Sequence, residues 1–579
     1  MPTRKAWLKY YEPHVPEHLE YPKTALSVLL TETARKFPDR AAIIFKGARI
    51  TFRELNEQVD RFAAVLQKLR IEKGDRVAIH LPNCPQFVIS YYGVLRAGGI
   101  VVPCNPLYQA HEMTHQLKDS GAEVIVTLSS MYPLIRRIRP QTKLRHIIVA
   151  EIKTYFPPVL KMLFTLLMEK KKGHRVSISG DADTHWFFEL MEKERGKPSP
   201  VPLDLEDTAV LMYTGGTTGI SKGAQLTHKN ILVNAYQCKN WLNSPDGIEI
   251  TMTQIPLFHC YGMTTCMNLS ILSANTMVLI PDPRDLEDVI KTIHKFKPTL
   301  YPGVPAIYNS INNFPELAKY DLSSIKACIS GAAGLPVEVQ QKFQQITGAR
   351  LVEGFGLSEA SPVTHANPVF GDNRIGTIGL PWPDTEVRIV DVDTGTQELG
   401  AGEIGELCIR GPQVMKGYWN MPGETANSLR PDPDGLGNWL YTGDIAIMDD
   451  DGYFRIVDRK KDMILGAGGY NIYPREIEDV LYQHPKVLEA AALGIPMEGK
   501  GERIKVFVIL KPGESVTGEE IIAFCHENLA AYKVPKIVEF RNELPKTTVG
   551  KILRRELLGQ ELARQSEVKE KEAAATIAT

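Results

Sequence analysis

The stretch at positions 213–223 reads YTGGTTGISKG and is a dense group of residues that could hold an anion. Its glycines let the main chain approach a phosphate closely, and its hydroxyls and Lys222 add hydrogen-bond donors and positive charge. The apolar run at 209–212 indicates a buried strand before it, and Thr227 is a candidate helix N-cap after it. The stretch therefore predicts a phosphate-binding loop that leaves a buried strand.

The spacing around Lys222 decides between two kinds of phosphate loop. A Walker A loop has glycine directly before its lysine and Ser or Thr directly after it. Here Ser221 precedes Lys222 and Gly223 follows it, so an ordinary P-loop nucleoside triphosphatase is not expected. A plain surface turn remains the alternative, although such turns usually carry Pro, Asn or Asp rather than paired threonines.

Five shorter stretches also contain residues that could do chemistry. Taken singly, each has a plain structural interpretation: a histidine packed in the core, a turn between strand and helix, a glycine-containing strand end, an aspartate in a turn, or a lysine in a basic segment. The stretches are FHCYGM at 258–263, SGAAGLP at 330–336, GFGLSEA at 354–360, YTGD at 441–444 and TTVGKILRR at 547–555.

The composition limits the class of protein that must position these residues. The chain has 579 residues, 43% hydrophobic and 23% charged, with a formal net charge of -1. This length predicts several subdomains, and the charge gives no reason to expect a nucleic-acid partner. The eight cysteines form no CxxC pair, so neither a zinc site nor a disulfide framework is predicted, and a reducing, cytosolic setting fits. The polar, proline-broken N-terminus predicts no signal peptide.

One segment raises the question of a membrane, although no apolar run reaches transmembrane length. Residues 155–175 read YFPPVLKMLFTLLMEKKKGHR, a short apolar core with a lysine-rich end. Two interpretations stay open. The segment is an amphipathic patch that touches a membrane surface, or it is a helix docked on the body of the protein with a solvated basic end.

Helix and strand patterns alternate in the first part of the chain. Thr51 and Glu54 form a capping box that predicts a helix with an apolar face of Leu55, Val59, Phe62 and Leu66. The patterns then predict a strand at 76–82, a helix at 85–99 and a strand at 100–106. This alternation predicts α/β layers with largely parallel strands.

Strand patterns dominate further along the chain. Short strands with Gly and Pro turns at 374–419 predict a small β subdomain. Asp451 and Gly452 lie between two alternating strands and predict a hairpin. The hairpin ends in the charged stretch 458–462.

The last part of the chain has its own α/β pattern, which predicts a separate C-terminal domain. Pro474 begins a predicted helix with Ile477, Val480 and Leu481 on one face. Strands are expected at 487–493 and 504–510. The polar, alanine-rich end is expected to fray.

Six stretches together resemble the adenylate-forming superfamily, which includes acyl-CoA synthetases, insect luciferases and the adenylation domains of peptide synthetases. They occur in the order and rough spacing of that superfamily, and the resemblance covers about Leu26 to about Leu558, with the nearest likeness to bacterial long-chain fatty acid–CoA ligases. One departure is Ser221, where members commonly have proline. The six are YTGGTTGISKG, FHCYGM, GFGLSEA, YTGD, DRKKDMI and PKTTVGKILRREL.

The resemblance implies an α/β fold in two unequal parts. The large N-terminal domain, 1–457, is expected to contain layered α/β subdomains and a small β-rich subdomain. A hinge at 458–463 is expected to lead to a small, mobile α+β C-terminal domain at 464–558, followed by a flexible tail at 559–579. A hinge has a purpose here because two half-reactions need different lids over one site.

The reaction that the resemblance implies has two halves. A carboxylate attacks the α-phosphate of ATP and gives acyl-AMP and pyrophosphate, and the thiolate of CoA then displaces AMP. A long-chain fatty acid is the expected substrate, and ATP and CoA are the expected co-substrates. The alternatives are a medium-chain, aryl or other carboxylate–CoA ligase of the same fold, and a non-catalytic sensor that binds acyl-AMP or nucleotide.

The resemblance assigns residues to the adenine, the ribose and the phosphates of ATP and to the Mg²⁺ ion. Phe355 is expected to stack on adenine, and Asp444 and Arg459 are expected to bind the ribose hydroxyls, because a carboxylate can accept two donors at once. Glu359 is expected to hold Mg²⁺, a cation that prefers carboxylate oxygen. The expected phosphate ligands are Thr214, Gly215, Gly216, Thr217, Thr218, Gly219, Lys222 and Ser358, and the expected lining of the adenine pocket is Gly331, Ala332, Ala333 and Gly354.

Other residues are assigned to the reacting groups. Lys551 is expected to bridge the incoming carboxylate and the α-phosphate, and His259 is expected to lie beside both. No acidic residue occurs at 258–272, which favours an apolar acyl chain over an amino acid. The expected acyl pocket contains Phe258, Tyr261, Met263 and Gly303, and the expected CoA channel contains Gly468, Gly469 and Tyr470. A cytoplasmic enzyme is expected, and a homodimer and a peripheral contact with a membrane through 155–175 are left open.

Overall fold

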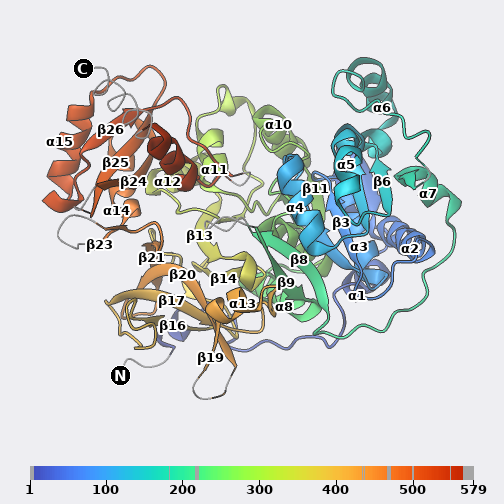
Figure 1. Ribbon diagram of the computed structural model, residues 1–579, viewed down its shortest axis with the longest axis horizontal. Helices are drawn as coiled ribbons and strands as arrows, with labels where there is room; N and C mark the ends of the chain where they lie inside the picture. The colour runs from blue at the N-terminus through green and yellow to red at the C-terminus, as the bar shows by residue number, and fades with distance from the viewer. Residues whose placement is uncertain are drawn as a thin grey trace, which may run out of the picture.

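A sheet of eight strands forms the centre of the N-terminal half in the computed structural model, which describes residues 5–181, 183–214, 221–432, 435, 437–465, 471–497, 501–547 and 550–564. The strand order is β18-β9-β8-β4-β3-β5-β6-β7 (Figure 1). In that order the bounds are Gly417–Tyr418, Lys222–Thr227, Thr208–Thr214, Ile100–Pro103, Arg76–His80, Val124–Leu128, His146–Ala150 and Thr184–Trp186.

The central strands of this sheet run parallel, as the alternating pattern predicted. β3 pairs with β4 and β5, and β5 pairs with β6, all in parallel. Helices cover both faces: the first pair packs on the face of Val77 and Ile79, and the second on the face of Ala78 and Ile125. The first pair is α2 (Phe52–Lys68) and α3 (Pro85–Arg96), and the second is α4 (Ala110–Ser120) and α5 (Tyr132–Ile138).

The predicted capping box begins α2. The Thr51 side chain accepts a hydrogen bond from the Glu54 backbone N–H, and Glu54 Oε2 accepts one from the Thr51 N–H at 2.7 Å. The four residues of the predicted apolar face are all fully buried. α2 therefore lies where its sequence pattern places it.

A second layered region follows the first. One sheet has the order β10-β11-β1-β2 and another the order β12-β13-β14-β15, and bridges through Leu300 connect β10 to β12. The strands are β10 (Ile250–Thr253), β11 (Thr276–Leu279), β1 (Ala41–Phe45), β2 (Ala48–Thr51), β12 (Ala327–Ser330), β13 (Arg350–Gly356), β14 (Val363–Ala366) and β15 (Leu380–Pro381). The main helices of this region are α8 (His228–Trp241), α10 (Leu286–Phe296), α11 (Pro305–Asn312) and α12 (Val337–Thr347).

The β subdomain extends beyond its predicted limit at residue 419. Its sheet has the order β16-β17-β20-β19, with β21 paired to β20, so it continues to Arg459. The short β18 within the predicted range pairs with β9 of the central sheet instead. The strands are β16 (Glu386–Val390), β17 (Ile404–Arg410), β19 (Leu429–Pro431), β20 (Asn438–Met448) and β21 (Phe454–Arg459).

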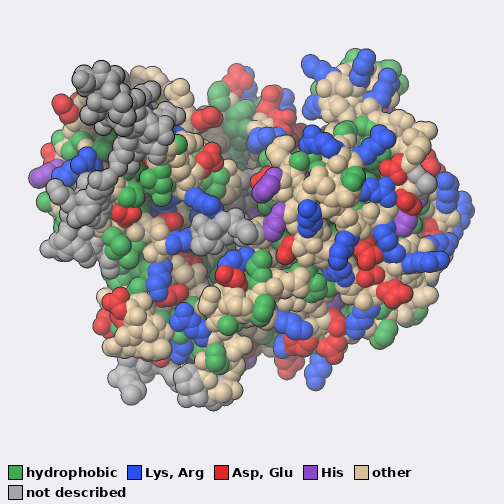
Figure 2. All heavy atoms as spheres, in the orientation of Figure 1, with side chains coloured by type: hydrophobic (Ala, Val, Ile, Leu, Met, Phe, Trp, Pro, Cys, Tyr) green, Lys and Arg blue, Asp and Glu red, His purple; other side chains and the backbone are tan. Residues whose placement is uncertain are grey.

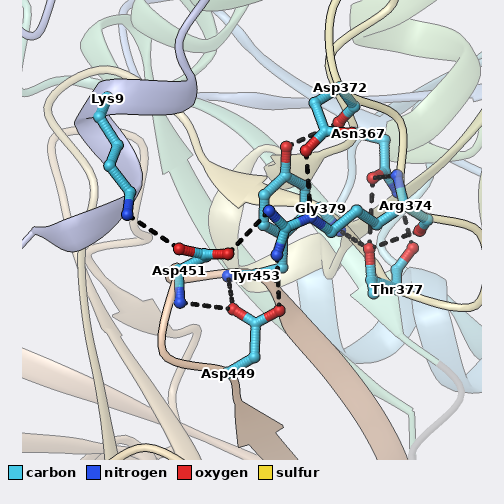
Figure 3. A network of polar contacts seen from close by, with 9 residues as sticks. All are labelled: Lys9, Asn367, Asp372, Arg374, Thr377, Gly379, Asp449, Asp451 and Tyr453. Carbon is cyan, nitrogen blue, oxygen red and sulfur yellow. Dashed lines mark hydrogen bonds and ion pairs between the residues drawn. The ribbon is translucent and has the colours of Figure 1, made fainter.

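Polar contacts attach the N-terminal segment to the β20–β21 hairpin (Figure 3). Lys9 Nζ lies 2.8 Å from Asp451 Oδ1, and the Arg374 guanidinium lies 2.9 Å from both Asp449 and Asp451. The same guanidinium lies over the Tyr453 ring, 4.0 Å from its centroid. The predicted turn is therefore held from two other parts of the chain, which steadies the strand that continues back to Asp444.

The C-terminal domain is smaller and lies to one side of the rest (Figure 1). Its helix α14 begins at Pro474, as predicted, and its sheet has the order β24-β25-β26. Helical structure continues to 564, past the expected boundary at 558, and Glu561 lies 2.6 Å from Lys505. The elements are β22 (Ile464–Leu465), β23 (Asn471–Ile472), α14 (Pro474–Gln483), β24 (Val487–Met497), β25 (Gly501–Leu510), α15 (Gly518–Asn528) and β26 (Ile537–Phe540).

Candidate functional site

The predicted phosphate loop connects two antiparallel strands. β8 ends at Thr214, and Thr214 pairs with Lys222 at the start of β9. The sequence did not reveal β9, but Thr227 caps α8 as predicted, because its side chain accepts a hydrogen bond from Asn230 N–H. Ser221 Oγ donates to the Thr214 carbonyl at 2.8 Å and so ties the two strand ends together. The other expected phosphate ligands, Gly215, Gly216, Thr217, Thr218 and Gly219, lie outside the described residues.

Lys222 faces residues that the sequence did not indicate. Its ammonium pairs with Glu424 of α13 (Pro422–Ser428) and lies 5.4 Å from the centroid of the Tyr418 ring. Tyr418 arrives here because β18 pairs with β9. Its hydroxyl donates to Glu359 Oε1 at 2.8 Å, so the phosphate lysine and the expected magnesium ligand share one neighbour.

Glu359 fits the role of a magnesium ligand. Its carboxylate is half-buried beside Tyr418, and only its Oε1 accepts that hydrogen bond. Among the described residues there is no cluster of three His, Cys, Asp or Glu side chains that could hold a metal alone. Magnesium is commonly bound by one or two carboxylates together with substrate phosphates, so a lone carboxylate beside a phosphate lysine suits it.

Ser358 brings the phosphate residues to the stretch around His259. Ser358 Oγ lies 3.2 Å from Cys260 Sγ, which links the end of β13 to the residue after His259. The backbone N–H of Tyr261 donates to His259 Nδ1 at 3.2 Å. Burial lowers the pKa of His259 to about 4, so the ring is neutral at physiological pH, with its proton on Nε2.

The expected adenine loop lies against the expected acyl pocket. Tyr261 donates to the Ile329 carbonyl at 2.5 Å, and a Cβ placed on Gly331 would lie 3.3 Å from the Tyr261 ring. Gly303 is bridged to Ser330, and a Cβ on Gly303 would lie 2.5 Å from the Tyr308 ring. Glycine is therefore required at 303 for steric reasons. Ala332 has a positive φ of 68° and shapes the turn that also includes Ala333.

The stretch expected to contact the acyl chain is apolar and buried. Gly262–Asn268 form a π-helical turn, η6, in which every residue is buried. Met263 is fully buried, whereas Phe258 is half-buried at the start of the stretch. This stretch suits an apolar substrate, and none of its own residues is a carboxylate that could pair with an ammonium group.

The two expected ribose ligands pair directly across the β20–β21 hairpin. Asp444 is the Cα partner of Arg459, and Arg459 Nε lies 2.7 Å from Asp444 Oδ1. Asp444 is only 2% exposed, and its Oδ2 has no hydrogen-bond partner. Buried acceptors are nearly always satisfied, so this oxygen points to a missing donor such as a sugar hydroxyl.

Lys551 joins this pair from the C-terminal domain. Burial lowers the pKa of Lys551 to about 8, Arg459 lowers it further, and Asp444 opposes both. A Cβ on the preceding Gly550 would lie 3.3 Å from Ala306 in α11. The lysine therefore lies near Asp444 and Arg459, on a turn that contacts the N-terminal domain.

Charged residues that were not predicted connect the domains. Arg475 at the start of α14 lies 3.6 Å from Glu353 of β13, and a Cβ on Gly334 would collide with its guanidinium. Burial raises the pKa of Glu353 to about 7, and Arg475 opposes this shift. Asp458 accepts a hydrogen bond from Arg475 N–H at 2.8 Å, which fixes the helix start to the end of β21.

Arg554, three residues after Lys551, connects α14 to the charged stretch 458–462. Its guanidinium lies 2.6 Å from Glu478 and 3.2 Å from Asp462. Lys461 lies in the same stretch, and burial together with the charge of Arg459 lowers its pKa to about 8, against the opposing charges of Asp462, Asp444 and Glu359. Gly468, Gly469 and Tyr470 of the expected CoA channel lie outside the described residues.

Two family models match most of the chain. The AMP-binding enzyme model matches residues 30–419, and the model of the AMP-binding enzyme C-terminal domain matches residues 476–551. Both matched regions contain expected site residues, Lys222 and Glu359 in the first and Lys551 in the second.

Curated relatives and solved structures agree with these models. The chain is 49% identical to a long-chain-fatty-acid–CoA ligase of Bacillus subtilis over 97% of this chain and 99% of that protein. It is 41% identical to a ligase of the same name from Escherichia coli O157:H7, over 96% and 98%. The crystal structure of an anthranilate CoA ligase in complex with anthranoyl-AMP has a TM-score of 0.83 at 28% identity, and the match covers 94% of this chain and 99% of that one.

Proposed function

The chain belongs to the AMP-binding enzyme family, and we propose that it converts a long-chain fatty acid, ATP and CoA into acyl-CoA, AMP and pyrophosphate. The observation that carries this proposal is the ion pair of Asp444 with Arg459, two residues whose charges also act on Lys551 of the C-terminal domain. A buried carboxylate oxygen without a donor suits a ribose, and an ammonium beside it suits the attack of a carboxylate on a phosphate. The names of the two ligases support the fatty acid as substrate.

In the first half-reaction, a carboxylate oxygen of the fatty acid attacks the α-phosphorus and pyrophosphate leaves. The Lys551 ammonium offsets the negative charge that the two anions bring together. Neutral His259 donates from Nε2 to an oxygen of the same group without adding charge. Lys222 binds the leaving phosphates after exchanging Glu424 for them.

Glu359 and the phosphate oxygens would hold Mg²⁺, which would supply positive charge against the triphosphate. Tyr418 keeps the Glu359 carboxylate in place through its hydroxyl. In the second half-reaction the CoA thiolate attacks the acyl carbon, the bond from that carbon to oxygen breaks, and AMP leaves with the oxygen. This step is assigned to a second arrangement of the C-terminal domain, reached by a turn at 458–463.

A panel of carboxylates tests the substrate. The purified chain is given ATP, Mg²⁺ and CoA with acetate, octanoate, palmitate, oleate or benzoate, and AMP and thioester are both measured. We expect the highest kcat/KM with palmitate or oleate. Faster turnover of benzoate or acetate would support an aryl or short-chain ligase of the same fold, and no AMP with any acid would support a sensor.

We also propose a cytoplasmic location, a homodimer and a peripheral contact with a membrane through 155–175. Among the described residues, no helix is both long enough and apolar enough to cross a bilayer. The exposed leucines in this segment support the peripheral contact.

A further inference from the structure

A helical segment at 158–168 presents its apolar side chains to solvent. α6 (Pro158–Leu163) continues directly into the π-helical turn η5 (Phe164–Met168), and neither contains a buried residue. The five apolar residues Val159, Met162, Leu163, Leu166 and Leu167 are 67%, 56%, 44%, 73% and 68% exposed. Their spacing is i, i+3, i+4, i+7 and i+8, which places them in one stripe. In most surface helices such a stripe faces the core.

The opposite side of the segment is attached to the protein, so the stripe cannot simply turn inward. The ring of Phe164 packs at 5.5 Å on Phe156, which packs at 5.6 Å on Phe45 of β1. Glu169 at the end of the segment is buried and lies 2.6 Å from Lys153. These contacts set the orientation of the helix. In Figure 1 the segment stands apart from the central sheet.

Basic side chains lie within the segment and directly after it. Lys161, Lys170 and Lys171 are exposed, and within the described part of the chain they form no ion pair. Figure 2 shows Lys and Arg side chains gathered on the lobe that this segment forms. An exposed apolar stripe with a rim of free lysines is the composition of a helix that lies in the interface of an anionic bilayer.

We infer that this stripe, the five residues named above, docks on a lipid bilayer surface with anionic headgroups. The charges decide between a bilayer and a second copy of the chain. A symmetric pairing of two stripes would bring the two sets of lysines together, because such an interface uses the same surface on both subunits. Anionic headgroups neutralise the lysines instead, while the leucines enter the acyl boundary. The inference rests on the peripheral membrane contact proposed above and adds the residues and the lipid charge that make it, whereas the proposed reaction can hold without it.

Vesicle flotation with the full-length chain tests the inference. Vesicles of phosphatidylcholine alone are compared with vesicles that also contain phosphatidylglycerol. We expect binding to the anionic vesicles, and loss of nearly all binding in the double variant Leu166→Glu, Leu167→Glu. Replacing Lys170 and Lys171 by Gln is expected to weaken binding by about fivefold per lysine.

A matched control carries two glutamates on other exposed apolar residues, Ile248→Glu and Phe370→Glu, which are 59% and 53% exposed. This control is expected to float like the wild type, and thermal unfolding verifies that all variants are folded. Equal flotation of the stripe variant and the wild type would overturn the inference. Failure of the wild type to bind anionic vesicles would also overturn it. A third contrary result would be a dimer, measured by light scattering, that the stripe substitutions dissociate while vesicle binding stays unchanged.

Discussion

Lys551 is expected to act in only one of the two half-reactions. Its proposed role is to offset charge where a carboxylate meets an α-phosphate, and the later attack of a thiolate on acyl-AMP involves no such meeting. We therefore expect Lys551→Ala to slow formation of acyl-AMP by about 10²–10³. Conversion of supplied acyl-AMP and CoA to acyl-CoA should be largely spared. Pyrophosphate exchange and thioester formation from synthetic adenylate measure the two steps.

Lys546→Ala is the matched control for this variant, because Lys546 lies on the same segment and pairs with Glu489 within the C-terminal domain. It should affect neither step strongly. Equal losses in both steps for Lys551→Ala would mean that the lysine has a structural role.

The charge of Lys551 predicts a pH dependence. Its pKa in the free protein is lowered to about 8, so the charged form is present below that pH and is lost as the pH rises through it. We expect kcat/KM for adenylate formation to fall above about pH 8, because this ratio reports the free enzyme. In Lys551→Arg the side chain stays charged, so the fall near pH 8 should disappear even if the rate is lower.

Lys461 must be separated from this effect, because burial lowers its pKa to about 8 as well. A Lys461→Gln variant should keep the fall near pH 8. If kcat/KM for adenylate formation no longer falls near pH 8 in Lys461→Gln but still falls in Lys551→Arg, then Lys461 is the titrating group.

The unpartnered oxygen of Asp444 predicts selectivity for ribose. A hydrogen bond to a charged group is worth about 1.5–3 kcal/mol, so Asp444→Ala should lower kcat/KM for ATP by roughly 10- to 150-fold. The wild type should prefer ATP over 2′-deoxy-ATP or 3′-deoxy-ATP, and the variant should lose much of that preference. A variant that discriminates as well as the wild type would show that the carboxylate contacts something other than the sugar.

At the scale of elements, α14 and β13 form a clamp between the domains. Arg475 at the start of α14 reaches Glu353 of β13, and Glu353 is 5% exposed with Oε2 unpartnered. Loss of the guanidinium should cost the closed arrangement about 1–3 kcal/mol, equivalent to about 5- to 150-fold in its population. Arg475→Ala should therefore slow adenylate formation by a factor in this range and leave thioester formation from acyl-AMP nearly unchanged.

The control for the clamp is Lys533→Ala. Lys533 pairs with Glu476, the neighbour of Arg475 on α14, and this pair lies within the C-terminal domain. Glu353→Gln should be milder than Arg475→Ala, since the raised pKa of Glu353 means that its neutral form is accessible near pH 7. A loss of thioester formation that matches the loss of adenylate formation would contradict a clamp specific to the first step.

Local patterns predicted most of the elements. The capping box of Thr51, the parallel strands around β3 and the helix that begins at Pro474 depend on neighbours in sequence, and the structure confirms them. β9 was missed because the polar residues Lys222 and Gln225 interrupt its apolar pattern. The β subdomain was cut short because its last strands are separated from the first by α13.

Residues of the candidate site could be predicted where they lie in a sequence motif. Residues that reach the site only through packing of distant segments could not. The resemblance predicts Asp444, Arg459 and Lys551 as site residues. In the structure Asp444 pairs with Arg459, and both act electrostatically on Lys551, while their roles stay predictions. Tyr418 and Glu424 were not found, because they reach Glu359 and Lys222 only through the pairing of β18 with β9. No local pattern marks a residue whose function comes from a distant strand pair.

At the scale of the whole molecule, the account requires one site served by two arrangements of the chain. The described arrangement has Lys551 within the electrostatic reach of Asp444 and Arg459, and Arg475 on Glu353, so it suits the proposed first half-reaction. Thioester formation needs the C-terminal domain to leave this position. The stripe at 158–168 lies in the N-terminal domain, so docking on a bilayer would leave the smaller domain free to turn.

Transfer of oxygen from the fatty acid tests the central claim most directly. The protein is incubated with ATP, Mg²⁺, CoA and palmitate labelled with ¹⁸O in both carboxylate oxygens. The masses of the products are then measured by mass spectrometry. Because a carboxylate oxygen bonds to the α-phosphorus and stays there when the thiolate displaces AMP, we predict one ¹⁸O in AMP, one in palmitoyl-CoA and none in pyrophosphate. Unlabelled AMP, or label in orthophosphate together with ADP, would contradict an acyl-adenylate and with it the function assigned to this site.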